Sequence, residues 1–212
     1  MVPTQEDLVA IALQVGNYFL EIGPFIVFGA VAAAAQVTVF GRRSGPWTGD
    51  RLIAPIAAVP LGVLLIAVAA IRSLLIYRTT PVPAEDPVGH ERGVIRRAFT
   101  YVEDLIVPFV ISAGIGAVIV VMTPTEPLWT ILSADGPWRL IIAPLVAGIV
   151  RPRGGAEIPL IMAMMTKGLD PAGAIAGIAG AGYLHARSIP MGALHVAFGV
   201  ALGALFWLTG LA

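Results

Sequence analysis

The residues best placed to do chemistry form one short polar segment between two apolar runs. The segment reads Arg-Pro-Arg-Gly-Gly-Ala-Glu over residues 151–157, and the runs cover residues 140–150 and 158–165. A helix start beside two guanidinium groups suits an anion, because exposed backbone N–H groups and arginine side chains both bind negative oxygens. The candidate substrate-binding residues are therefore Arg151, Arg153, Glu157, Gly154 and Gly155. The alternative is that both arginines mark the cytoplasmic end of a membrane segment.

Two further carboxylates and two histidines lie close to apolar stretches. Glu21 and Glu103 are candidates for a proton or ion relay, because an ionisable group inside a membrane is costly and usually functional. Their alternative is a position at the membrane surface, where a helix start stabilises an acidic side chain. His185 and His195 could ligate a porphyrin or chlorin pigment, although two isolated interfacial histidines explain them better. No third ligand stands at metal spacing, so the sequence predicts no metal site.

The composition indicates an integral membrane protein. Of 212 residues, 58% are hydrophobic and 12% are charged, whereas a soluble domain carries roughly 25% charged residues. Lys plus Arg and Asp plus Glu number 13 each, so no basic excess attracts nucleic acid. The chain has no cysteine and therefore no disulfide or thiolate ligand. Glu6 and Asp7 stand where a signal peptide would carry Lys or Arg, so we expect a retained first helix. The expected location is a bacterial inner (cytoplasmic) membrane.

The hydrophobic pattern predicts an all-α, polytopic membrane fold with about five or six membrane-embedded helical segments. Long segments are expected over residues 8–40, 52–71, 98–123 and 189–211, and a glycine-rich one over residues 171–184. The two runs that flank residues 151–157 are each far shorter than the ~20 residues that cross a bilayer. They predict either a re-entrant hairpin or two short tilted helices joined by a surface loop. Broken segments of this kind mark the binding sites of many transporters.

The hydrophilic stretch over residues 78–97 is expected to link two membrane halves, residues 1–77 and residues 98–212, the second with its re-entrant region over 140–168. An internal repeat is suggested by Pro24-Phe25 and Pro108-Phe109, each preceded by a glutamate, although the spacing differs by two residues. Arginines gather both in residues 41–51 and in residues 72–97. Charge therefore leaves open whether residues 52–71 cross the membrane or re-enter it, and also the orientation of the chain.

Part of the second half resembles a known family. Glu157-Ile158-Pro159-Leu160, Ala163, Lys167-Gly168, Pro171 and Gly173-Ala174 resemble the predicted-permease family that includes organoarsenical efflux permeases, and Glu21, Pro24-Phe25 and Gly29 look like its opening helix. The resemblance implies a polytopic α-helical permease with the re-entrant region as its substrate site. The arsenical exporters carry cysteines just before the Pro-Leu helix, where this chain has none. Arsenic coordination by thiolate is therefore not expected here.

Two functions follow from these observations. The first is a permease-like protein that moves a small solute, for which the arginines favour an anion. The alternative is a non-transporting structural or pigment-contacting accessory subunit of a larger membrane complex, favoured by the short chain and the absence of a second Lys-Gly hairpin. No nucleophile, metal set or paired carboxylates indicate an enzyme. The expected partners are lipid, a small solute, and further copies of the chain or a larger complex. The glycine pairs Gly173/Gly177 and Gly199/Gly203 predict close helix packing, within the chain or, for an accessory subunit, against a neighbour.

Overall fold

The computed structural model describes residues 3–40, 52–79, 93–132, 137–150, 155–181 and 189–209. These residues form helices and no strand, as the sequence predicts. The elements are α1 (Gln5–Phe40), α2 (Ile53–Ala57), η2 (Val59–Leu61), α3 (Val63–Thr79), α4 (Val94–Met122), α5 (Thr125–Leu132), α6 (Arg139–Ala147), α7 (Ile158–Thr166), α8 (Pro171–Gly180) and α9 (Ile189–Thr209). Helix covers both ends of the expected 78–97 linker, and residues 80–92 lie outside the described part.

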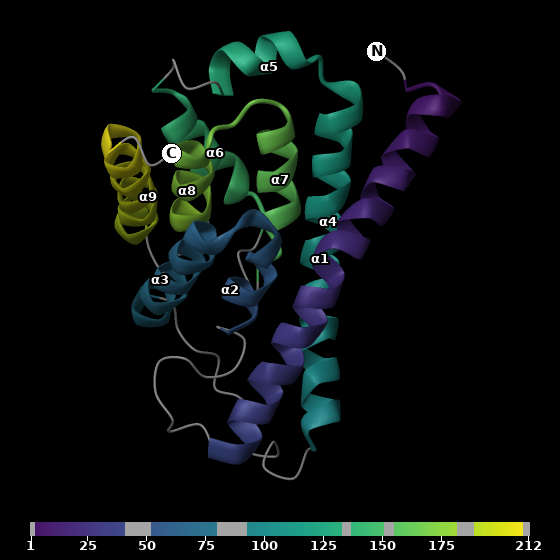
Figure 1. The fold of residues 1–212 in the computed structure, drawn as a ribbon, viewed down its shortest axis with the longest axis vertical. Helices are drawn as coiled ribbons and strands as arrows, with labels where there is room; N and C mark the ends of the chain where they lie inside the picture. The colour runs from purple at the N-terminus through teal and green to yellow at the C-terminus, as the bar shows by residue number, and fades with distance from the viewer. Residues whose placement is uncertain are drawn as a thin grey trace.

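Three of the described helices are long and apolar enough to cross a membrane, namely α1, α4 and α9. They indicate a membrane protein. Helices α1 and α4 lie side by side and extend beyond the other helices at the lower end of Figure 1, with Phe19 against Phe109 at 4.9 Å between ring centroids. Each continues through an internal proline, Pro24 or Pro108. Their outer faces expose large apolar side chains such as Leu20, as lipid-facing helices do.

The prediction of one helical segment over residues 52–71 is wrong, because the chain breaks there. Helix α2 ends at Ala57, and α3 begins only at Val63. Gly62 between them has φ +103°, a conformation that side chains other than glycine rarely adopt. Helix α2 then packs closely on α1, since a methyl group at Gly29 would lie 3.0 Å from the Ile53 Cα. Residues 52–71 therefore form two short pieces rather than one long helix.

Three further short helices, α6, α7 and α8, occupy the centre of the upper part of the molecule (Figure 1). Helix α6 ends at Ala147 and α7 begins at Ile158, so helicity stops on both sides of the polar segment. Helix α8 lies against α3, α6, α7 and α9, and all its residues after Pro171 are buried. The short helices are thus enclosed by protein on several sides.

The glycine pairs serve packing within the chain. A methyl group at Gly199 would lie 2.5 Å from the Ala176 carbonyl oxygen, and one at Gly203 would lie 2.7 Å from that of Ala172. Gly177 faces α6 and α7, where a methyl group would lie 2.5 Å from the Ile161 side chain. The contacts at Gly199 and Gly203 bring the α8 and α9 backbones together. The accessory-subunit interpretation expects a glycine pair to face a neighbouring chain. In this structure both pairs are instead occupied by contacts within the chain.

Candidate functional site

The site is built on the hairpin of α7 and α8. The turn after α7 is set by Gly168, whose φ is +104°. The Gly168 N–H donates to the Met165 carbonyl at 3.1 Å and the Leu169 N–H to the Met164 carbonyl at 2.9 Å, a Schellman arrangement that ends the helix. Asp170 then begins α8 by accepting a hydrogen bond from the Gly173 N–H at 2.9 Å. The chain therefore reverses sharply, and the start of α7 lies beside the end of α8.

Neither arm of the hairpin could cross a bilayer alone. Helix α7 has 9 residues and α8 has 10. At ~1.5 Å per residue they reach about 14 and 15 Å, half of the ~30 Å of a hydrocarbon core. In a membrane, the open end of the hairpin would therefore lie well inside the hydrocarbon if the closed end lay at its surface. Polar groups at that open end need partners within the protein.

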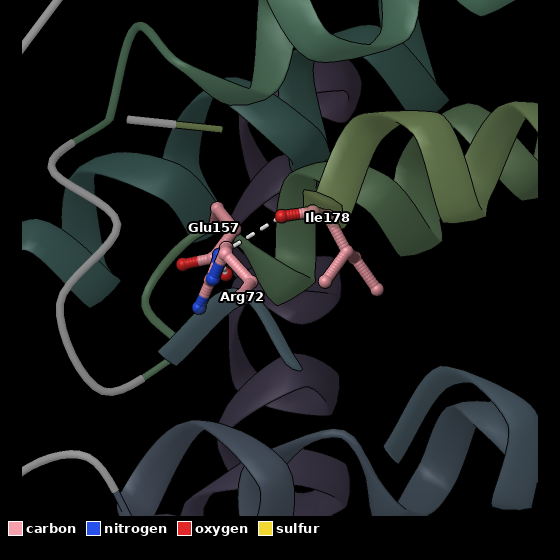
Figure 2. Close-up of polar contacts among 3 residues, drawn as sticks. All are labelled: Arg72, Glu157 and Ile178. Atoms are coloured by element: carbon pink, nitrogen blue, oxygen red, sulfur yellow. Dashed lines mark hydrogen bonds and ion pairs between the residues drawn. The ribbon is translucent and has the colours of Figure 1, made fainter. Parts of the chain in front are cut away.

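A buried ion pair closes the open end (Figure 2). The Arg72 guanidinium, from α3, donates through Nη1 to Glu157 Oε1 at the start of α7 and to the Ile178 carbonyl oxygen near the end of α8, the latter at 3.3 Å. The relative exposure of both ionised side chains is 1%. Glu157 Oε2 and Arg72 Nε have no hydrogen-bond partner among the described residues. The pair thus ties three elements together while keeping an unused acceptor and an unused donor.

Each charge of this pair sits at the favourable end of a helix. Glu157 is the N-cap residue of α7, where the helix dipole is positive. Arg72 binds one of the last carbonyls of α8, where the dipole is negative. His195 of α9 is also buried. The helix ends therefore help to hold both charges in the protein interior.

The closed end of the hairpin carries a second set of buried charges. Asp170 Oδ1 pairs with Arg139 Nε at 2.8 Å, and the Arg139 guanidinium lies 5.1 Å from the centre of a Trp207 ring. Lys167 Nζ donates to the Thr123 carbonyl at 2.8 Å and lies 3.3 Å from Thr125 Oγ1. Lys167 follows α7, and Asp170 precedes α8, so both again suit the helix dipoles. This end is held by its own partners and is separate from the Arg72–Glu157 pair.

Asp170 offers a test of the closed end. Asp170→Asn should keep the cap of α8 but lose the ion pair. We expect the free energy of unfolding to fall by about 3 kcal/mol, because Arg139 stays buried without its counter-charge. The remaining contact with the Trp207 ring keeps the loss from being larger. Asp170→Ala should lose the cap as well and cost about 1 kcal/mol more. Chemical unfolding in detergent, followed by circular dichroism, measures both. Equal stability of the Asn variant and the parent would contradict the ion pair.

The structure brings together only part of the predicted site. Glu157 and Gly155 are buried at the start of α7, and Gly155 has φ +81° and lies against Ala57 of α2. Arg151, Arg153 and Gly154 lie outside the described residues, as does His185. Glu21 and Glu103 lie on exposed sides of α1 and α4. Of the predicted groups, Glu157 alone is shown in a buried ion pair.

Sequence reasoning missed the partner of Glu157. Arg72 follows the apolar run over residues 52–71, a position typical of a membrane interface, but its side chain is buried at 1% exposure. The sequence feature that could have indicated burial of Arg72 is its position as a single charge between the apolar stretches 52–71 and 74–76. Arg139, also fully buried, follows an exposed Trp138 and carried no comparable signal.

Among the described residues, no three His, Cys, Asp or Glu side chains gather as a metal site would require. At the open end of the hairpin, the Glu157 carboxylate and the Arg72 guanidinium each keep an unused hydrogen-bonding atom. No protein-family model, curated protein or solved structure matches the chain.

Proposed function

We propose that this chain is a permease-like membrane protein that moves a small solute, with the Arg72–Glu157 pair and the helix ends around it as the substrate site. The observation that carries the proposal is a hairpin of half-length helices whose charged ends meet in the interior. Transporters build their sites in this way, because unpaired helix ends and buried charges can bind a solute that replaces water. An arginine at the centre favours an anionic solute.

A broken-helix architecture supports the same proposal. With α1, α4 and α9 as spans, α2–α3 and α6–α7 are two interrupted segments, which together give about five or six membrane-embedded segments. Each interrupted segment packs on a glycine of a long proline-containing helix: α2 on Gly29 of α1, and α7 on Gly116 of α4, where a methyl group would lie 3.1 Å from the Pro159 carbonyl. We take this correspondence as support for an internal repeat and for re-entrant segments.

The orientation follows from the long helices. Helix α1 ends, and α4 begins, at the same end of the molecule (Figure 1). Three arginines follow α1 in residues 42–51, and Arg92, Arg96 and Arg97 surround the start of α4. In a bacterial inner membrane, the positive-inside rule puts this end in the cytoplasm. The N-terminus, with Glu6 and Asp7, then lies on the opposite side.

An accessory subunit is the second candidate, and one observation favours it. Glu157 is fully buried and paired, so the site is closed in this structure, as expected for a charge pair that only holds helices together. A pigment contact, through His185 or His195, belongs to this candidate alone. The two candidates differ in whether the pair must open.

Solute flux in reconstituted vesicles separates them. The purified chain should transport at least one member of a panel of nitrate, chloride, phosphate and arsenite. The double variant Arg72→Gln/Glu157→Gln removes both charges without leaving either unpaired, and we expect it to fold but to lose at least tenfold in flux. The matched control is Arg96→Gln, which removes an exposed arginine and should transport like the parent. An inactive parent protein that co-purifies with other membrane subunits would favour the accessory role.

A further inference from the structure

We propose that Glu157 binds the proton that drives this permease, and that one proton and one monovalent anion move together, with Arg72 as the partner of the anion. The inference rests on the proposed transport function and names its coupling ion and its substrate class. It begins from the two charges that the described residues place at the open end of the hairpin, one guanidinium and one carboxylate, which together carry no net charge.

A proton can reach this closed pair without displacing a side chain. Both side chains are fully buried, so no solute reaches them without a rearrangement. Glu157 Oε2, however, is a buried acceptor with no partner among the described residues. A proton that binds there needs no room, and it removes the negative charge that holds Arg72 Nη1. Protonation therefore loosens the link that ties α3 to the start of α7.

The anion follows from the charge that remains. With Glu157 neutral, Arg72 is an unpaired cation in an apolar interior, which is unfavourable. Arg72 then has one Nη1 hydrogen released, while Nη1 still donates to the Ile178 carbonyl, and its Nε is already unused. A monovalent anion beside this guanidinium restores a net charge of zero. Proton alone and anion alone each leave a net charge, so the two are bound and released together.

Within the part of the chain that the structure describes, few other groups near the pair could take over these roles. Helix α9 contributes the buried His195. Helix α1 contributes the buried Tyr18, which lies beside Gly116 where α4 meets Pro159 of α7. The first residue of α6, Arg139, pairs with Asp170 before α8, and Lys167 after α7 binds Thr123, all at the opposite end of the hairpin. On α4, Glu103 and Asp104 are exposed.

The test measures coupling in vesicles that contain the full chain. Nitrate and iodide are the probes, because neither crosses lipid as a neutral acid. With the outside acidic, nitrate uptake should rise at least tenfold and should take up one proton per anion, read as alkalinisation of a weakly buffered medium. A membrane potential set with potassium and valinomycin should leave the rate unchanged, because the paired movement carries no net charge.

The variant Glu157→Gln imitates the protonated carboxyl permanently. Its nitrate flux should lose the dependence on the pH gradient and should instead follow the potential, while the exposed control Glu126→Gln should behave like the parent. One-to-one coupling that survives in Glu157→Gln would overturn the assignment of the proton to Glu157. Proton uptake per nitrate in the parent protein still tests the coupling, even if this variant does not fold.

The two proposals fail in different ways. Anion flux that follows the potential and takes up no proton would overturn the coupling and leave the transport function standing. An absence of nitrate and iodide flux, with flux of arsenite as neutral arsenous acid, would overturn both the anion class and its coupling to the proton and leave the transport function standing. No flux of any probe would overturn both.

Discussion

Glu157→Gln and Arg72→Gln are each expected to lower the free energy of unfolding by about 3–5 kcal/mol, because each leaves an ionised partner buried without its counter-charge. The double variant should regain most of this loss, since two neutral amides leave no unpaired charge. Unfolding in detergent for the parent, both single variants and the double variant gives a complete double-mutant cycle. The pair is fully buried, so solvent does not screen the effect.

The cycle also distinguishes structure from transport. If the pair only held helices together, restored stability in the double variant would be its whole consequence. If it is the solute site, the double variant should be stable and inactive. Additive losses, with the double variant the least stable of the four proteins, would show that the two side chains do not interact in the folded state.

Gly199→Ala should also destabilise the fold, by a smaller amount. A single methyl group there meets three backbone atoms of α8, at 2.5, 2.7 and 2.8 Å, and backbone cannot move aside as a flexible side chain can. We expect a loss of about 1–3 kcal/mol from overpacking. The matched control is Gly114→Ala in α4, where nothing lies within 4 Å of the added methyl. That variant should be more stable by up to about 1 kcal/mol, because alanine favours helix over glycine.

Thermal unfolding of both glycine variants in one detergent checks this contrast. Equal effects at the two positions would mean that α8 and α9 are not in close backbone contact. The same comparison bears on the Arg72–Glu157 site, because α8 carries the Ile178 carbonyl that Arg72 binds. A shifted α8 in Gly199→Ala should therefore also reduce flux.

The long helices could be predicted from the sequence because the length of an uninterrupted apolar run gives the length of the membrane helix directly. Residues 98–123 and 189–211 were expected as spans, and α4 and α9 occupy almost these residues. The break inside residues 52–71 was missed although its cause is local. Pro60 lacks a backbone N–H, and Gly62 adopts a positive φ, yet the apolar composition around them outweighed both signals.

The ion pair could not be predicted from local pattern. Glu157 stands out in the sequence because it begins an apolar helix, but its partner lies 85 residues away on another helix. Two arginines stand much closer in the sequence, and spacing alone favours them. Helix packing, rather than proximity along the chain, brings Arg72 to the start of α7.

The short helices at the centre also bear on how the protein is made. Segments of 9 or 10 residues are too short to be inserted into a bilayer one by one, so α7 and α8 must enter together with longer neighbours. One of those neighbours is α9, the last helix of the chain, whose glycines complete the face against which α8 packs. We therefore expect the central hairpin to reach its final depth together with α9, so that it does not insert before this helix has been made.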